Sequence, residues 1–393
     1  MSESGQLDTA ESVASISPKT LYDSITAGED VFILDTRAEA DYDEWHIEGE
    51  TVETLNKPYY ELLEGIPEPL HEDLPDDRPI VVLCAKGESS RLVADHLADA
   101  GYEVAHLADG MEGWARIYEA TTLTVDTEAT IVQYRRPSSG CLSYLVISAG
   151  EAALIDPLRE FTDRYRDDIA ARDADLAYVL DTHVHADHIS GLRALTRATD
   201  ATAVLPRPAV DRGVDYDLPY QTVGDGDQLT VGDAVLDVVH TPGHTTGMTA
   251  YKVGPVLFTG DGLFTESVAR PDLEDPDAAE GAAQTLYETL TETVLTYPAD
   301  TTVAPGHFSD AATPAADGSY TATLGTLETE MAALTMAEDR FVDYIVADMP
   351  PRPANYEDII ATNLGEQRPD DEEAFALELG PNNCAASDDA LTN

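Results

Sequence analysis

Basic residues are scarce in this chain of 393 residues. Lys and Arg together number 22 against 76 Asp and Glu, so the formal net charge is -54 at pH 7. Only four of the basic residues are lysines: Lys19, Lys57, Lys86 and Lys252. Because a surface this negative repels phosphate, we expect no nucleic-acid partner. The carboxylates are spread along the whole chain among regular apolar segments, which favours a folded, halophilic protein over a disordered one.

Cysteine is also scarce, and the sequence shows neither a targeting signal nor a long apolar run. The three cysteines, Cys84, Cys141 and Cys384, are too few and odd in number for a disulfide framework, which indicates a reducing cytoplasm. The N-terminus is polar and acidic, whereas a secretory signal is basic and then apolar. No apolar run approaches the length of a transmembrane helix. We therefore expect a cytoplasmic protein without a membrane partner, and its oligomeric state, monomer or homodimer, stays open.

The length and a hydrophobic fraction of 43% are sufficient for two domains with cores of their own. The first is expected over residues 14–119, where short apolar strands alternate with helices. These strands are expected at residues 31–34, 80–83 and 104–107. Such alternation predicts an α/β domain with a parallel sheet. A short linker is expected near residues 120–123, and a second domain over residues 124–393.

Cys84 stands where the strand at residues 80–83 gives way to a helix. Backbone N–H groups and the positive end of the helix dipole stabilise a thiolate there, and the thiolate is the nucleophilic form of cysteine. A buried, inert cysteine is the alternative, but Gly87 and the paired serines that follow favour a reactive loop. A phosphatase loop would place Arg six residues after the cysteine, and Ser90 stands at that position. Cys84 is therefore predicted to be a catalytic nucleophile outside the phosphatase class.

The first domain resembles the rhodanese (sulfurtransferase) family along nearly its whole length. The likeness is carried by residues 34–37, 45–49, 84–90 and 110–114. The family often has Gly before the His of the second stretch, and this chain has Trp45 there, away from the chemistry. In that family the loop cysteine carries a persulfide sulfur that the loop amides surround. The resemblance implies this role for Cys84.

Residues of the types that bind metals cluster directly after the apolar run at residues 176–180. His183, His185, Asp187 and His188 fall within six residues, although the chain has only ten His. Strand ends further along the chain carry three more candidates: His244, Asp261 and His307. Imidazole and carboxylate are ligands of zinc, iron and manganese. A loop of solvated histidines is the alternative, but the ordered set of seven favours a metal site.

These seven residues, in this order, resemble the ligand series of the metallo-β-lactamase superfamily. The resemblance implies that residues 124–393 form an αββα sandwich with metals at one edge of its two sheets. The expected fold class is thus α/β, with a rhodanese-like parallel-sheet domain followed by this sandwich. The superfamily includes glyoxalase II, lactonases, nucleases and dioxygenases, so the ligand series leaves the reaction open.

The segments after Asp261 resemble the persulfide dioxygenase branch of the superfamily, which is related to glyoxalase II. The likeness is carried by residues 269–273, 341–349, 351–353 and 380–384. It implies one non-haem Fe(II) ion on His183, His244 and Asp261, which oxidises a low-molecular-weight thiol persulfide to sulfite with O₂.

The remaining metal-type residues, His185, Asp187, His188 and His307, would then surround this ion or form an unfilled second metal position. Arg270 matches a family position associated with substrate, and an ion pair with Asp272 or Glu274 is the alternative. A fused rhodanese domain agrees with this branch, because one domain would transfer persulfide sulfur and the other would oxidise it.

Two other functions stay open. One is a binuclear zinc hydrolase of glyoxalase II type, which would cleave a hydroxyacyl thioester with a metal-bound hydroxide and with Asp261 bridging the two ions. Every ligand that it needs is present in the sequence. The other is a non-catalytic sulfur carrier or persulfide sensor based on Cys84, which would have no use for the metal ligands. The identity of the persulfide-bearing thiol and the direction of sulfur flow are not encoded in these motifs.

Overall fold

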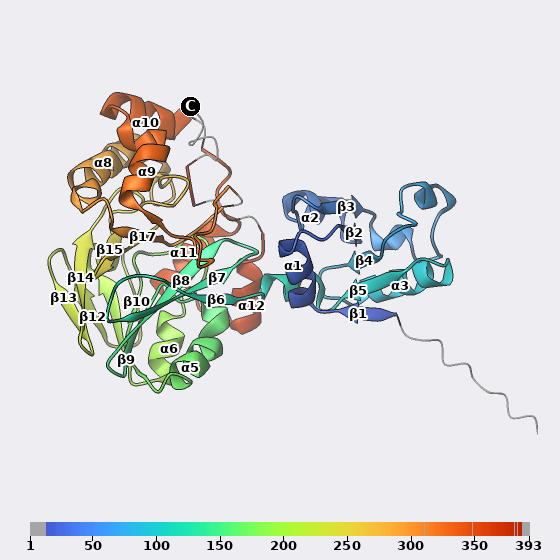
Figure 1. Ribbon diagram of the computed structural model, residues 1–393, viewed down its shortest axis with the longest axis horizontal. Helices are drawn as coiled ribbons and strands as arrows, with labels where there is room; N and C mark the ends of the chain where they lie inside the picture. Colours follow the sequence, from blue (N-terminus) through green and yellow to red (C-terminus); the bar gives the residue numbers. More distant parts are fainter. Residues whose placement is uncertain (1–12, 310, 348, 381, 383, 387–393) are drawn as a thin grey trace, which may run out of the picture. The chain divides into compact units, whose positions relative to one another are not determined.

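The computed structural model describes residues 13–309, 311–347, 349–380, 382 and 384–386 (Figure 1). The chain divides into two compact units, Met1–Ile117 and Tyr118–Asn393, and each is described here by itself. None of the helices in the described part of the chain is long and apolar enough to cross a membrane.

The first unit is built on a parallel five-stranded sheet with the order β1-β5-β4-β2-β3. Its strands are β1 (Ala14–Ile16), β2 (Val31–Asp35), β3 (Val52–Asn56), β4 (Ile80–Leu83) and β5 (Val104–Leu107). Its helices are α1 (Pro18–Thr26), α2 (Glu39–Glu44), α3 (Ser89–Asp99) and α4 (Gly110–Ala115), with 3-10 turns at Tyr59–Glu61 and Glu68–Glu72. Both central strands, β2 and β4, are buried along their whole length, as expected of a parallel sheet covered on both faces.

Separate cores on the two faces of this sheet orient the strand that precedes Cys84. Leu21 of α1 and Trp114 of α4 pack on one face, and Val93 and Leu97 of α3 pack on the other. Cys84 therefore lies at the carboxyl end of a central strand, where loops of a parallel sheet form ligand sites.

The second unit contains two sheets. The seven-stranded sheet has the order β12-β11-β10-β9-β8-β7-β6 and the six-stranded sheet the order β13-β14-β15-β16-β17-β18. The strands of the first are β6 (Glu119–Thr122), β7 (Thr130–Arg136), β8 (Cys141–Ser148), β9 (Glu151–Ile155), β10 (Asp175–Leu180), β11 (Thr202–Pro206) and β12 (Tyr220–Val223). Those of the second are β13 (Gln228–Val231), β14 (Ala234–His240), β15 (Thr249–Val253), β16 (Val256–Gly260), β17 (Thr302–Pro305) and β18 (Ala322–Thr323).

Helices cover the outer faces of both sheets, so the unit has four layers in the order αββα (Figure 1). The helices are α5 (Thr162–Ala170), α6 (Leu192–Ala198), α7 (Arg207–Asp211), α8 (Ala279–Glu292), α9 (Leu324–Glu330), α10 (Glu338–Ala347), α11 (Tyr356–Leu364) and α12 (Asp371–Leu377). The central core joins residues of both sheets, such as Tyr144 and Phe258. Tyr165 of α5 packs on the outer face of one sheet and Leu286 of α8 on the other. The expected fold class is confirmed.

One local expectation was wrong. Of residues 120–123, expected to be a linker, the first three instead belong to strand β6, which pairs antiparallel with β7 and lies in the second unit. Thr121 and Thr122 lie opposite Gln133 and Val132, and this β-branched pair has a high strand propensity. The composition of a short Thr-rich run did not distinguish a linker from an edge strand.

The charge predicts that the protein needs concentrated salt to stay folded. At a net charge of -54, the folded chain repels itself, and molar salt shortens the range of this repulsion to about 3 Å. We expect the melting temperature to rise by roughly 10 °C or more between dilute buffer and molar KCl, which corresponds to a few kcal/mol of added stability. Thermal melting followed by circular dichroism measures this, and a melting temperature independent of KCl would disprove it.

Candidate metal centre and sulfur-transfer loop

The sandwich brings the seven metal-type residues to one edge, because each follows a strand that ends there. The loop with His183, His185, Asp187 and His188 follows β10, and His244 follows β14. Asp261 follows β16 and His307 follows β17, which are neighbouring parallel strands paired at Gly260 and Pro305. All seven side chains are buried. The structure therefore gathers a buried His/Asp cluster from four separate loops.

Three of the residues form a compact group. One ligand atom from each of His183, His244 and Asp261 lies within 4.8 Å of the others. Oδ2 of Asp261 is 3.7 Å from Nε2 of His183 and 3.8 Å from Nε2 of His244. Burial lowers the pKa of His183 well below its usual range and also lowers that of His244, so both rings are neutral. Two neutral imidazoles and one carboxylate are the ligand set of mononuclear non-haem iron sites.

In each of these three side chains, one polar atom is hydrogen-bonded to the protein, and the other polar atom faces the other two residues of the group. Nδ1 of His183 bonds to Thr182 Oγ1 at 2.9 Å, and Nδ1 of His244 donates to the carbonyl oxygen of Arg270 at 2.8 Å. Oδ1 of Asp261 accepts from Nδ1 of His307 at 2.7 Å. In contrast, Nε2 of His183 and Oδ2 of Asp261 are buried without a hydrogen-bond partner. A buried polar atom without a partner is costly, and a bound cation would remove this cost at both positions.

Among the other four candidates, each histidine is hydrogen-bonded to a carboxylate, and Asp187 is one of these carboxylates. His185 bonds to Asp156 Oδ1 through Nε2 at 3.1 Å. Oδ2 of Asp187 accepts from His188 Nδ1 at 2.9 Å and from His307 Nε2 at 2.8 Å. Burial alone would lower the pKa of His307, but the carboxylates of Asp261 and Asp187 raise it well above its usual range. His307 is therefore an imidazolium that joins two carboxylates, and in this form it binds no metal.

Arg270 is a buried anchor close to this group. Its guanidinium donates to both oxygens of Asp272, at 2.7 and 3.1 Å, and to the carbonyl oxygen of Pro351 at 2.9 Å. Arg352 donates to Asp272 as well, at 3.0 Å. The backbone carbonyl of Arg270 is the group that orients His244. The ion pair with Asp272, one of the two alternatives for Arg270, is thus present, while contact with a substrate stays a prediction.

In the first unit, the loop after β4 surrounds the sulfur of Cys84 with donors. The backbone N–H groups of Gly87 and Ser90 lie 3.1 and 3.4 Å from Sγ, and Oγ of Ser90 lies at 3.4 Å. Burial alone would raise the pKa of the Cys84 thiol, but the hydroxyls of Ser89 and Ser90 and the loop amides lower it below its usual value. The donors thus favour the thiolate at the start of α3.

Helix α4 contains the last stretch of the rhodanese-like pattern, residues 110–114, and its N-terminus contacts the Cys84 loop. The N–H groups of Met111 and Glu112 donate to the carbonyl oxygens of Cys84 and Ala85 at 2.9 and 3.0 Å. Gly110 has a φ of +55°, and a Cβ atom there would lie 2.0 Å from the carbonyl oxygen of Cys84. The motif therefore lets the α4 N-terminus approach the Cys84 loop and hold its backbone.

Comparison with known proteins agrees with both units. The family models for the metallo-beta-lactamase superfamily and the rhodanese-like domain match residues 137–307 and 17–117, respectively. The persulfide dioxygenase ETHE1, mitochondrial, of Mus musculus is 32% identical over 180 residues, which are 44% of this chain and 66% of that protein. The crystal structure of ETHE1 from Myxococcus xanthus is 30% identical with a TM-score of 0.52, and the match covers 60% of this chain and 98% of that one. The chain belongs to the ETHE1 branch of the metallo-β-lactamase superfamily.

The match spans just under two thirds of the mouse ETHE1 protein. A hydroxyacylglutathione hydrolase of Rhizobium meliloti (strain 1021) is also similar, with 30% identity over 145 residues, which are 36% of this chain and 52% of that protein. The relatives carry the names of enzymes of two kinds, so they support an enzyme and leave its reaction to be argued from the site.

Side chains that sequence reasoning missed hold the metal loop of this ETHE1-family chain. Asn363, on α11, donates through Nδ2 to the carbonyl oxygens of His185 and His188 at 3.0 and 2.8 Å, and its Oδ1 accepts from the N–H of Ser190 at 2.9 Å. Asn382 contacts Asp187 and His307. Asn382 lies within the stretch at residues 380–384 that resembled the family, but no local signal marked Asn363.

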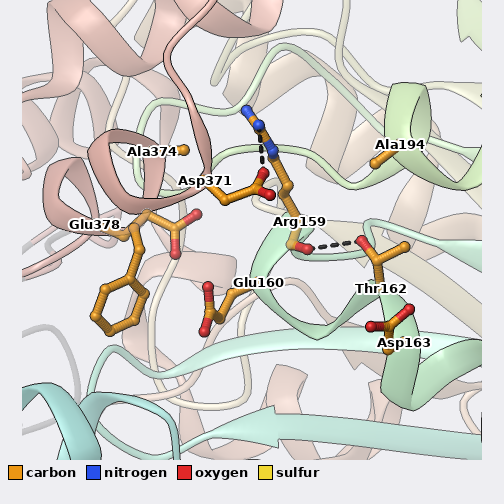
Figure 2. Close-up of a pocket in the computed structure, with 9 residues that line it drawn as sticks. Arg159, Glu160, Thr162, Asp163, Ala194, Asp371, Ala374 and Glu378 are labelled. Atoms are coloured by element: carbon orange, nitrogen blue, oxygen red, sulfur yellow. Dashed lines mark hydrogen bonds and ion pairs between the residues drawn. The ribbon is translucent and has the colours of Figure 1, made fainter.

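A cavity of about 300 Å³ is lined by residues of the segment 159–163, of α6 and of the C-terminal segment around α12 (Figure 2). Arg159 and Asp371 form an ion pair at 2.6 Å in its wall. Glu378, also in the wall, accepts from the N–H of Ile189 at 2.7 Å and from Arg136 at 2.6 Å. Ile189 directly follows His188, so Glu378 connects the wall of this cavity to the metal loop. The residues that line the cavity do not include the three of the compact group.

Proposed function

We propose that this chain oxidises the persulfide sulfur of a low-molecular-weight thiol to sulfite, with one Fe(II) ion held by His183, His244 and Asp261. One persulfide, one O₂ and one water would give one thiol, one sulfite and two protons. The observation that carries the proposal is the contrast between two sets of ligands. In the compact group, Nε2 of His183 and Oδ2 of Asp261 have no hydrogen-bond partner and lie 3.7 Å apart. In the other set, Oδ1 of Asp187 and Nε2 of His188 also lack a partner, but both ring nitrogens of His307 are already bonded to carboxylates.

Iron held by His183, His244 and Asp261 would supply the redox chemistry of this reaction, because unlike zinc it can change its oxidation state. The protein's own contribution is orientation. Thr182 and the Arg270 carbonyl fix which nitrogen of His183 and His244 faces inward, and the His307 imidazolium holds Asp261. Burial of all three residues keeps bulk water away from the ligands. The names of the ETHE1 relatives support the same reaction.

We further propose that Cys84 accepts and donates persulfide sulfur in the rhodanese-like unit. Its thiolate would attack the outer sulfur of a thiol persulfide, the donor's own S–S bond would break, and the donor would leave as a thiolate. The loop N–H groups would stabilise the resulting persulfide anion on Cys84. The two activities share one chemical species, a persulfide. The proposal concerns the chemistry of each unit separately and leaves the direction of transfer to experiment.

A second function has one observation in its favour. All seven ligands of a binuclear zinc thioester hydrolase are present and buried, and a hydroxyacylglutathione hydrolase is among the similar proteins. Such an enzyme needs a second ion on Asp187, His188 and His307 with Asp261 between the two ions.

Two assays on the same purified protein separate these functions. Iron-loaded protein given glutathione persulfide is expected to consume O₂ and to release sulfite in equal amounts, as an oxygen electrode and a sulfite assay would show. The same sample, and zinc-loaded protein, should hydrolyse lactoylglutathione slowly or not at all. Rapid thioester hydrolysis by protein with two bound zinc ions, without O₂ uptake, would establish the hydrolase and refute the dioxygenase.

A further inference from the structure

The side chain of Asn382 contacts three residues beside the compact group: Cys141, Asp187 and His307. Its side-chain nitrogen lies 3.2 Å from Oδ2 of Asp187, 3.0 Å from Nε2 of His307 and 3.3 Å from Sγ of Cys141. Its oxygen lies 3.4 Å from Sγ of Cys384. The amide is thus placed among the residues that would have to bind a second metal ion.

The surrounding donors are close enough to form such a second site. One atom each from Cys141, Asp187, His188 and His307 lie within 4.8 Å of one another. A thiolate, two imidazoles and a carboxylate form a four-ligand set well suited to zinc. Spacing between the ligands is therefore not what opposes a second ion.

What opposes it is the set of donors on Oδ2 of Asp187. This atom accepts from His188 and His307 at 2.9 and 2.8 Å, and Sγ of Cys141 lies at 3.2 Å. Each of these three groups becomes a metal ligand once it loses a proton. The amide nitrogen of Asn382 differs, because its lone pair is delocalised and it offers only N–H groups, whose positive ends repel a cation.

We propose that Asn382 limits this centre to one metal ion by placing its amide N–H groups in the second metal position. Proton loss can convert the neighbouring His and Cys side chains into ligands, but it cannot convert Asn382. In this orientation the side-chain oxygen faces Sγ of Cys384, at 3.4 Å, and the nitrogen faces Asp187 and Cys141. This inference rests on the proposed mononuclear function and assigns to one residue the choice between one ion and two.

The test is metal stoichiometry in two variants. Wild-type protein, Asn382→Ala and Asn382→Asp are incubated with excess Zn²⁺, desalted and analysed by elemental spectrometry. We expect one zinc ion per wild-type chain and close to two per variant chain. Asp at position 382 has nearly the same shape as Asn but replaces the donor with a carboxylate, so it should bind the second ion at least about 10-fold more tightly than wild type does. The Asp variant also keeps the test valid if the alanine variant is unstable.

Cobalt provides a readout that is independent of activity. A second Co²⁺ ion on the set with Cys141 should add a thiolate-to-cobalt absorption band that wild-type protein lacks. Gln367→Ala is the matched control, because Gln367 is an exposed amide in the same C-terminal segment that bonds to Asp358 at 2.9 Å. This control should keep one ion and show no thiolate band.

The possible outcomes separate this inference from the proposed function. One ion in wild-type protein and two in the variants would support both. One ion in wild-type protein and still one in both folded variants would overturn the role of Asn382 and leave the mononuclear function standing. Two ions in wild-type protein would overturn both.

Discussion

Replacing Asp261 with alanine is expected to abolish iron binding and O₂ uptake together. Asp261 supplies the carboxylate of the compact group, and its two oxygens have different tasks. Oδ2 faces His183 and His244, while Oδ1 accepts from His307. The variant would lose one of three ligands and also release the His307 imidazolium. Both iron content and persulfide-dependent O₂ uptake should fall by more than about 100-fold, since loss of an outer-shell partner alone costs 10- to 100-fold.

The control for this variant is Glu288→Ala, which removes an exposed carboxylate on α8 and changes the net charge by the same amount. Glu288→Ala should keep wild-type iron content and O₂ uptake. Elemental analysis and an oxygen electrode measure the two quantities on the same preparations. Full iron content in Asp261→Ala would mean that the ion lies elsewhere, on the set around Asp187.

The second large effect is expected at Cys84. Ser is nearly isosteric with Cys but is a far weaker nucleophile at neutral pH, so Cys84→Ser should lower thiosulfate:cyanide sulfur transfer by roughly 10³-fold or more. The loop should keep its shape, because Gly87 and Ser90 can donate to a hydroxyl oxygen as they do to sulfur. Iron content and O₂ uptake with an added persulfide should stay at wild-type levels, which makes the metal centre an internal control.

The pH dependence of the wild-type protein provides a further check on Cys84. The loop donors lower the pKa of this thiol, and the thiolate is the reactive form. The rate of sulfur transfer should therefore rise with pH through a midpoint below about 8.5, where a free thiol would be half ionised. A midpoint at or above that pH, or undiminished transfer by Cys84→Ser, would remove Cys84 as the nucleophile.

Metal-type residues could be identified from the sequence because their spacing is local. His183, His185, Asp187 and His188 are close along the chain and follow one strand, so they converge whatever the rest of the fold does. The parallel sheet of the first unit was predictable for a similar reason, since alternating strands and helices pair only in that way. Cys84 could be placed at a strand end from the same pattern.

The spacing of the seven metal-type residues along the sequence could not divide them into two sets, and only the family resemblance implied such a division. That division depends on which nitrogen or oxygen of each side chain already has a partner. His307 meets Asp187 across 120 residues of chain and Asp261 across 46. Arg270 was equally undetermined, because its pairing with Asp272 and its carbonyl contact with His244 depend on how the loop after Asp261 folds.

By itself the sequence determined which chemical groups this protein possesses: a loop cysteine at a helix start, and seven imidazoles and carboxylates at strand ends. Only the tertiary structure decided which of their nitrogen and oxygen atoms already have a hydrogen-bond partner. Asn363 reaches the carbonyl of His185 across 178 residues, and Asn382 reaches Asp187 across 195. Hydrogen bonds between residues so distant in the chain form only when the helices of the C-terminal segment pack against the sandwich. No local spacing of residues encodes that packing.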